Sequence, residues 1–148
     1  MWRPDARPLP GRHDGPKARR GGGYVTVIGV VRVRGRSMEP TLHTGDRLVV
    51  LRGAPPRVGR LAIVRLPDDS DGVRRPLAIK RVTMRDPADP SRYWVESDNQ
   101  AAPGVTDSWT HGIGSLAREQ IRALVLFRLP ASYPGRRLAR RLVRRFAR

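Results

Sequence analysis

The sequence contains no cysteine in its 148 residues. A disulfide framework, a thiolate nucleophile and thiolate metal sites are therefore excluded. Histidine is also scarce: His13, His43 and His111 lie far apart, with no pair at metal-ligand spacing. We expect no metal and no cofactor. Long apolar runs are missing too, because the longest near the start is Tyr24–Val31, whereas a membrane-spanning helix needs about 20 apolar residues.

Lysine is almost absent from a strongly basic chain. Lys and Arg together number 30, the formal net charge is +17, and the only lysines are Lys17 and Lys80. Much of the charge lies at the two ends, since residues 1–23 carry +4 and residues 136–148 carry +7. Arginine stays protonated at any workable pH, whereas a buried lysine can lose its proton near neutrality. A lysine inside the folded part is therefore a candidate for chemistry that needs a neutral amine.

The length fits one domain with extensions. Residues 1–23 are rich in Pro, Gly and Arg without hydrophobic periodicity, which predicts a disordered basic arm. Residues 24–130 form the predicted domain. Within 131–148, Leu138, Leu142 and Phe146 recur every four residues among arginines, which predicts a basic amphipathic tail helix. The charged start is followed by no secretory cleavage site, so we expect a cytoplasmic protein.

Short runs rich in β-branched and aromatic residues, separated by Gly, Pro and Asp, predict a mainly β fold with a small, strongly bent sheet. The segment 121–129 could also form a helix, but its composition favours a strand. The predicted strands are Tyr24–Arg34, Arg47–Leu51, Leu61–Leu66, Leu77–Met84, Arg92–Glu96 and Ile121–Leu129.

Lys80 lies within one of these runs. Alternation places it on the same face as Ala78 and Val82, with Ile79 and Arg81 on the other face. This pattern predicts an inward-facing amine. The simpler alternative is a lysine that reaches the surface, as most lysines do.

Ser37 lies between Gly35 and Pro40, in a segment typical of a tight turn. Such a turn can present a hydroxyl, which becomes a nucleophile when a neighbouring base accepts its proton. A neutral lysine can be that base. Two alternatives stay open: a local hydrogen bond from Ser37 to the backbone, and a Ser-His-Asp arrangement using His43 or His111 with Asp107.

Four segments in this order resemble the boxes of the serine–lysine signal peptidase family. They are Ser37–Leu42 (SMEPTL) for the nucleophile box, Gly45–Val50 (GDRLVV) for the next, Lys80-Arg81-Val82 for the general-base box, and Asp98-Asn99 with Asp107-Ser108 for the last. A single box would be weak, but four ordered boxes are specific.

The resemblance implies a serine endopeptidase with Ser37 as nucleophile and Lys80 as general base. It also implies the bent-sheet catalytic core that signal peptidases share with LexA-type repressor proteases, here over residues 24–130. Gly35, Arg36 and Met38 would lie at the oxyanion site and cleft. The residues expected to support the motifs are Pro40, Gly45, Asp46, Arg81, Asp98, Asn99, Asp107 and Ser108.

Three positions depart from the family pattern. Trp109 stands where the family usually has an Arg beside the Asp of the last box. Gly35 stands where some members have a Ser that stabilises the oxyanion, which leaves that role to backbone N–H groups. Val105 stands where some members have a Ser that orients the lysine, so Thr106 or Ser108 would have to replace it.

Without a membrane anchor, the chain is most similar to the proteases that mature nickel-type superoxide dismutase. That similarity implies removal of an N-terminal leader from the dismutase precursor, with no nickel bound by the protease. A second hypothesis is a membrane-surface signal peptidase whose residues 136–148 lie on anionic lipid. A third is a repressor-like nucleic-acid-binding protein, although only 5% of the residues are aromatic and we expect no specific nucleic acid.

Overall fold

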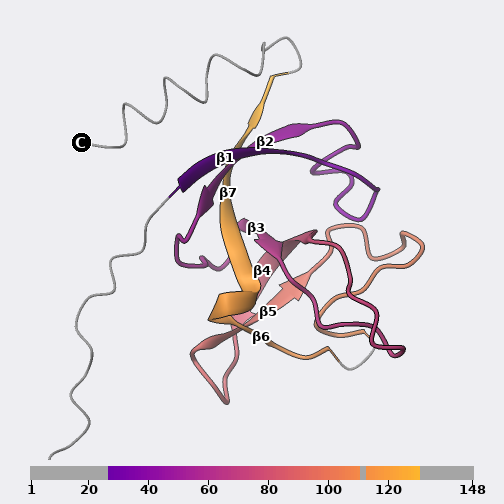
Figure 1. The fold of residues 1–148 in the computed structure, drawn as a ribbon, viewed down its shortest axis with the longest axis vertical. Coiled ribbons are helices and arrows are strands. Elements are labelled where there is room, and N and C mark those ends of the chain that lie inside the picture. Colours follow the sequence, from indigo (N-terminus) through magenta and orange to yellow (C-terminus); the bar gives the residue numbers. More distant parts are fainter. Residues whose placement is uncertain (1–26, 111–112, 131–148) are drawn as a thin grey trace, which may run out of the picture.

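The computed structural model describes residues 27–110 and 113–130. It is mainly β, as predicted (Figure 1). The elements are β1 (Val27–Arg32), β2 (Arg47–Arg52), β3 (Leu61–Val64), β4 (Ala78–Arg85), β5 (Arg92–Glu96), β6 (Leu116–Ala117), the 3-10 helix η1 (Arg118–Gln120) and β7 (Ile121–Leu129). Each predicted run overlaps one strand, although β2 and β4 each extend one residue beyond the predicted end. The predicted arm over 1–23 and tail helix over 131–148 lie outside the described residues.

Neither β6 nor η1 was predicted from the sequence. β6 has two residues, too few for a period to appear, and it pairs with β5 through Arg92 opposite Ala117. In the part of the chain described here, no helix is long and apolar enough to cross a membrane.

All seven strands form one antiparallel sheet in the order β1-β2-β7-β3-β4-β5-β6. The long strand β7 joins the two halves of this sheet (Figure 1). Its residues Ala123–Leu129 pair with β2, whereas Ile121–Leu124 pair with β3. Strand β7 therefore fixes the position of the β1–β2 half relative to the β3–β6 half.

The register shifts once in each of three strand pairs, between β2 and β7, between β3 and β7, and between β4 and β5. An extra residue on one strand bends and twists a sheet locally. In β7 the pairing passes from Ile121 to Ala123, so Arg122 is the extra residue and its two neighbours face opposite sides. These irregularities produce the strong bend that the sequence predicted.

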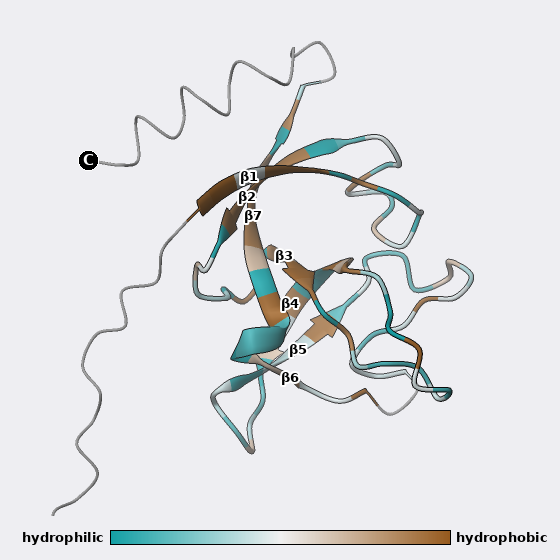
Figure 2. Ribbon diagram, viewed as in Figure 1, coloured by the Kyte–Doolittle hydropathy of each residue, from teal (hydrophilic) through white to brown (hydrophobic). Residues whose placement is uncertain are grey.

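Two apolar clusters pack against opposite faces of the central strands. The first contains Val33, Met38, Leu42, Leu48, Val50, Ile63, Ala123 and Val125, and the second contains Ala62, Val64, Leu66, Val82, Tyr93, Val95, Leu116 and Ile121. Figure 2 shows hydrophobic stretches along β1, β3 and β7. Because the first cluster includes Val33, Met38 and Leu42, it anchors the loop that carries Ser37 to the sheet.

Candidate active site

Ser37 lies in the loop between β1 and β2. Backbone hydrogen bonds close this loop at its base, from the Val33 N–H to the Asp46 oxygen at 2.8 Å and from the Gly45 N–H to the Val33 oxygen at 3.0 Å. The Met38 side chain is buried in the first apolar cluster. The loop is thus held at both its base and its tip, and Ser37 next to Met38 stays half-buried.

Gly35 adopts a positive φ of 84° two residues before Ser37. A side chain at this position would meet no atom within 4 Å, so the constraint is the backbone conformation, which L-residues rarely adopt. The Thr44 hydroxyl donates a hydrogen bond of 2.9 Å to the Gly35 oxygen and holds this conformation. The glycine that departs from the family pattern is therefore required by the shape of this loop.

Lys80 lies in the middle of β4, and its predicted inward orientation is confirmed. Only 3% of the residue is exposed, and Val82 on the same face is fully buried in the second apolar cluster. Ile79, on the other face, packs against the first cluster. A lysine so deeply buried is unusual, because burial disfavours its charged form.

The Lys80 amine has one hydrogen-bond partner among the described residues. Nζ donates to the Ser97 hydroxyl oxygen at 2.5 Å, and Ser97 is itself 4% exposed. A protonated ammonium group has three donors, so one neutral acceptor leaves two unpaired. Burial lowers the pKa of Lys80, and the charge of Asp107 raises it by a smaller amount. The site therefore favours a neutral amine.

Ser97 is a site residue that was not predicted from the sequence, although it directly precedes the Asp98-Asn99 pair of the last box. The candidates named for orienting the lysine are occupied elsewhere. The Ser108 hydroxyl accepts a hydrogen bond of 2.8 Å from the Val95 N–H, and the Thr106 hydroxyl donates to the Gly104 oxygen at 3.5 Å. The available signal was position, since Ser97 directly follows β5, the neighbour of β4 in the sheet.

The segment 97–99 connects the Lys80 strand to the Ser37 loop. The Asn99 backbone N–H donates to the Ser37 carbonyl oxygen at 2.9 Å, and the Asn99 side-chain amide donates to the Arg36 carbonyl oxygen at 3.1 Å. Between them, Asp98 receives two hydrogen bonds from the Arg81 guanidinium, at 2.8 and 2.6 Å. Three of the four resembling segments thus meet at one place in the fold.

The Arg81–Asp98 pair shifts both groups toward their charged forms. Burial by itself raises the pKa of Asp98, but hydrogen bonds from Arg81 and Thr41 together with the Arg81 charge outweigh it and hold that pKa below its ordinary value. The pKa of Arg81 is raised, mainly by its hydrogen bond to Asp98. Arg81 also donates to the Gly59 oxygen at 2.9 Å.

Asp107 is fully buried. Its Oδ1 accepts a hydrogen bond of 3.1 Å from the Trp109 N–H, whereas its Oδ2 has no partner among the described residues. Trp109 stands at the position of the family's Arg, but its side chain contacts Glu96 instead of Asp107. Its Nε1 donates to Glu96 Oε1 at 2.6 Å, and its ring packs on Trp94 with centroids 4.4 Å apart. Asp107 therefore acts on Lys80 as a nearby charge, and no arginine of residues 27–110 or 113–130 forms an ion pair with it.

No hydrogen bond joins Ser37 to Lys80 within the described residues. The Ser37 hydroxyl lines a pocket of about 370 Å³, whereas the Lys80 amine is bonded to Ser97. Catalytic hydrogen bonds are often long or misaligned before substrate binds and tighten only in the complex. The loop and the strand that carry the two groups are nevertheless tied together through segment 97–99.

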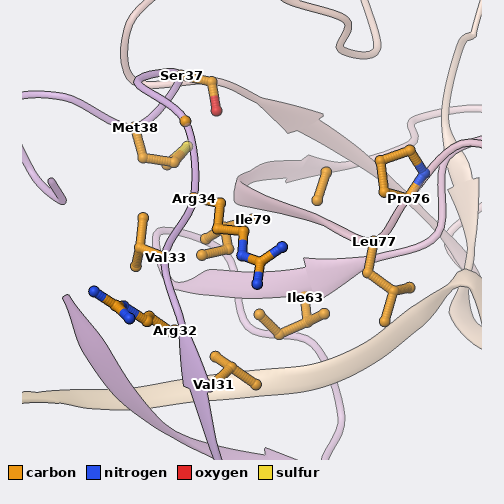
Figure 3. A pocket seen from close by; sticks show the side chains of 12 residues that line it. Val31, Arg32, Val33, Arg34, Ser37, Met38, Ile63, Pro76, Leu77 and Ile79 are labelled. Atoms are coloured by element: carbon orange, nitrogen blue, oxygen red, sulfur yellow. The ribbon is translucent and has the colours of Figure 1, made fainter. Parts of the chain in front are cut away.

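The pocket lies between the chain after β1 and the start of β4. Figure 3 shows the Ser37 hydroxyl at one end, with Val31, Val33, Met38, Ile63, Leu77 and Ile79 along the walls. Met38 thus both packs in the core and lines the cleft. Arg32 and Arg34 also line the pocket (Figure 3), which gives a mainly apolar cleft a basic margin.

The other expected residues have structural contacts near the loop. Arg36 forms an exposed ion pair with Glu39 at 3.1 Å, and the peptide bond before Pro40 is cis. The Asp46 carboxylate accepts hydrogen bonds from the His43 backbone N–H at 2.9 Å and from the Arg128 guanidinium at 3.1 Å. The His43 bond is the largest cause of the lowered pKa of Asp46.

The Ser-His-Asp alternative gains no support from the described residues, since no contact joins exposed His43 to Asp107, and His111 lies outside them. In the described ranges, no three His, Asp or Glu side chains gather as a metal site.

Comparison with known families adds one finding. The family model described as Peptidase S24-like matches residues 26–109. The match covers more than half of the chain and includes Ser37, Lys80 and the connecting segment 97–99. No curated protein matches the chain.

Proposed function

The chain belongs to the Peptidase S24-like family of serine peptidases, and from this premise we propose that it is an endopeptidase with a Ser-Lys dyad. Ser37 is the nucleophile and Lys80 is the general base. The observation that carries the proposal is the buried Lys80 amine with one neutral hydrogen-bond partner. A general base near neutral pH needs a lysine of lowered pKa, and burial lowers this one.

Ser37 is a better nucleophile candidate than Ser97, although Ser97 is the one bonded to the lysine. Ser97 is 4% exposed, so a peptide carbonyl has no path to its hydroxyl. Ser37 is half-buried and lines the pocket. In addition, the N–H groups of Ser37 and Met38 donate to no described residue. They are free to stabilise a developing oxyanion. Backbone donors are needed here because Gly35 lacks the hydroxyl that some family members use for this purpose.

The proposed reaction proceeds through an acyl-enzyme. Lys80 accepts the Ser37 hydroxyl proton while Oγ forms a bond to the scissile carbonyl carbon. The C–N bond then breaks, and the Lys80 ammonium returns the proton to the departing amine. A water molecule gives its proton to Lys80 and attacks the ester. Collapse of this second tetrahedral intermediate breaks the bond between the acyl carbon and Ser37 Oγ and releases the acid product. Oγ takes the proton back from the Lys80 ammonium, which restores the hydroxyl and the neutral amine.

Among the described residues, two unpaired strand edges border the pocket and could accept an extended substrate. β1 pairs only with β2, and the β4 residues before Arg81 have no partner on β5. The pocket lies between these two edges (Figure 3). A peptide in extended conformation can add to such an edge through main-chain hydrogen bonds, with alternate side chains entering the pocket. The apolar walls favour small or apolar side chains there.

We further propose, from the motif resemblance, that the substrate is the precursor of a nickel-type superoxide dismutase, cleaved in the cytoplasm to release its leader. The test is to incubate the full chain with the precursor and to measure the precursor's N-terminus by mass spectrometry. Wild type should remove one defined leader, and Ser37→Ala should remove none. Equal cleavage by Ser37→Ala would overturn the assignment of the nucleophile.

Membrane signal peptidase activity makes a different prediction in the same assay. Cleavage would then require anionic vesicles, and a preprotein with an apolar export signal would be cut in preference to the dismutase precursor. Cleavage of the precursor in plain buffer, at a rate that vesicles do not change, favours the proposed maturation role.

A further inference from the structure

A second serine at the site performs a task that the reaction scheme does not assign. We propose that Ser97 is a positioning residue, which fixes the direction of the Lys80 lone pair and thereby sets the efficiency and the pKa of the base. The inference rests on the proposed function, because a positioning residue presupposes a base. It begins from the 2.5 Å contact between Lys80 Nζ and Ser97 Oγ, both of which are buried.

The geometry of an amine explains why one hydrogen bond matters. A neutral lysine nitrogen carries two N–H bonds and one lone pair in tetrahedral directions, and it rotates freely about the bond to Cε unless something holds it. When one N–H donates to Ser97, the lone pair can occupy only the two remaining staggered positions instead of all three. Catalysis is sensitive to such alignment, since small errors of geometry cost large factors in rate.

Ser97 is itself held in place by the sheet and the turn that follows it. It comes directly after β5, whose residue Glu96 pairs with Arg81 of β4. The Gln100 side-chain amide donates to the Ser97 carbonyl oxygen at 2.9 Å. Asp98, which follows Ser97, accepts two hydrogen bonds from Arg81. The hydroxyl therefore has a rigid backbone behind it, as a positioning group requires.

Other groups near the amine cannot take this role. The charge that acts on Lys80 is that of Asp107, which is not within hydrogen-bond distance of Nζ. Arg81 and Ile79 lie on the opposite face of β4, and Arg81 is paired with Asp98. Val82 and Ala78, on the same face, are apolar. Among the described residues, the Ser97 hydroxyl is thus the single polar contact that can orient the amine.

The chain's two lysines provide a test that needs no substrate. Protein labelled with 13C at the lysine Cε should give two signals, and loss of one in Lys80→Arg assigns Lys80. We expect Ser97→Ala to lower the pKa of Lys80 by about half a unit or more, because a hydroxyl oxygen stabilises the ammonium form more than the amine. An unchanged Lys80 titration in folded Ser97→Ala contradicts the proposal.

Kinetics of precursor cleavage provide the second measurement. Ser97→Ala should lower kcat at least tenfold with KM within about twofold of wild type, and the acid limb of the pH profile should move to lower pH. Ser97→Thr and Ser97→Val have side chains of nearly equal shape, but only threonine keeps a hydroxyl. Ser97→Thr should therefore restore kcat and return the acid limb of the pH profile toward its wild-type position, whereas Ser97→Val should not. Equal rates for the pair would overturn the proposal even if Ser97→Ala failed to fold.

Ser115→Ala is the control for loss of a buried hydroxyl. Ser115 is 7% exposed, donates to Asp86 at 2.5 Å and accepts from Arg92 at 3.0 Å, away from Lys80. It should lose thermal stability without moving the Lys80 titration or the pH profile. The two proposals fail on different results. Cleavage by Ser37→Ala would overturn the proposed function. If Ser37→Ala is inactive but the Ser97 variants cleave and titrate like wild type, only the positioning role of Ser97 is overturned.

Discussion

The backbone N–H of Asn99 donates a hydrogen bond of 2.9 Å to the carbonyl oxygen of Ser37. Together with the amide contact from Asn99 to the Arg36 oxygen at 3.1 Å, it fixes the Ser37 loop to the segment that follows β5. Lys80 is bonded to Ser97 in the same segment. The distance between the proposed nucleophile and the proposed base is therefore set by a few polar contacts that span three separate parts of the chain.

Asn99→Ala should weaken this connection without removing a proposed catalytic group. The substitution removes the side-chain bond to Arg36 but leaves the backbone bond to Ser37, so we expect a loss of about 1 kcal/mol in the free energy of unfolding. Because the Ser37 loop loses one of its anchors, kcat for precursor cleavage should fall several-fold. Urea denaturation and cleavage kinetics measure the two effects, and an unchanged kcat would contradict the anchoring role.

Asp98→Asn should make the protein less stable at neutral pH and less sensitive to acid. The pKa of Asp98 is below its ordinary value in the folded state, so its contribution is complete above the unfolded-state pKa and is lost as the pH falls through the folded-state pKa. Loss of the charged hydrogen bonds to Arg81 should cost about 1.5–3 kcal/mol at pH 7.

The measurement for Asp98→Asn is the free energy of unfolding from pH 7 down to pH 2. The difference from wild type should shrink toward the acid end. A difference that stays constant over this range would show that the Arg81 contact does not depend on the Asp98 charge.

Lys80→Met should stabilise the protein at neutral pH while abolishing cleavage. The folded-state pKa of Lys80 is lowered, so the unfolded chain binds more protons between that pKa and the ordinary lysine pKa of 10.5. Stability of wild type must therefore rise with pH across this window. Each unit of lowering corresponds to about 1.4 kcal/mol, and methionine avoids this cost.

Denaturation at pH 7 and near pH 10.5 tests this prediction. Lys80→Met should be more stable than wild type at pH 7, with the advantage falling as the pH rises. A wild-type stability that is flat between these pH values would mean that burial does not shift the Lys80 pKa.

Leu77→Asp should impair substrate binding more than chemistry. Leu77 lines the pocket and is 50% exposed, so the change places a charge on an apolar wall without opening the core. Losing about half of a leucine's burial energy is worth roughly 1 kcal/mol, which predicts a rise of about fivefold in KM. Val73→Asp is the matched control, since Val73 is 60% exposed and lies outside the pocket lining.

Much of the fold could be predicted from local patterns in the sequence. Alternation around Lys80 in the predicted run Leu77–Met84 indicated its inward side, because burial on one face leaves a period of two in the sequence. The apolar, β-branched composition of Leu61–Leu66 predicted a strand there without such alternation. The two-residue strand β6 and the extra residue Arg122 left no such trace. Their positions depend on pairing with β5 and β3, which are distant in sequence.

The candidate site divides in the same way. Ser37 and Lys80 stood out through a shaped turn and through a lysine among arginines, both of which are local signals. The contact from Lys80 to Ser97 depends on where β5 ends beside β4, so the sequence pointed instead to Thr106 and Ser108. Trp109 illustrates the opposite case, because its replacement of an arginine was visible but its contact with Glu96 was not.

The central claim is that Lys80 must be able to give up its proton. Lys80→Arg keeps a long cationic side chain but cannot act as a base near neutral pH, and circular dichroism can confirm that the variant is folded. The decisive measurement is its initial rate of precursor cleavage relative to wild type. The account predicts a loss of at least about 100-fold, in line with removal of a general base, whereas a rate within twofold of wild type would contradict it.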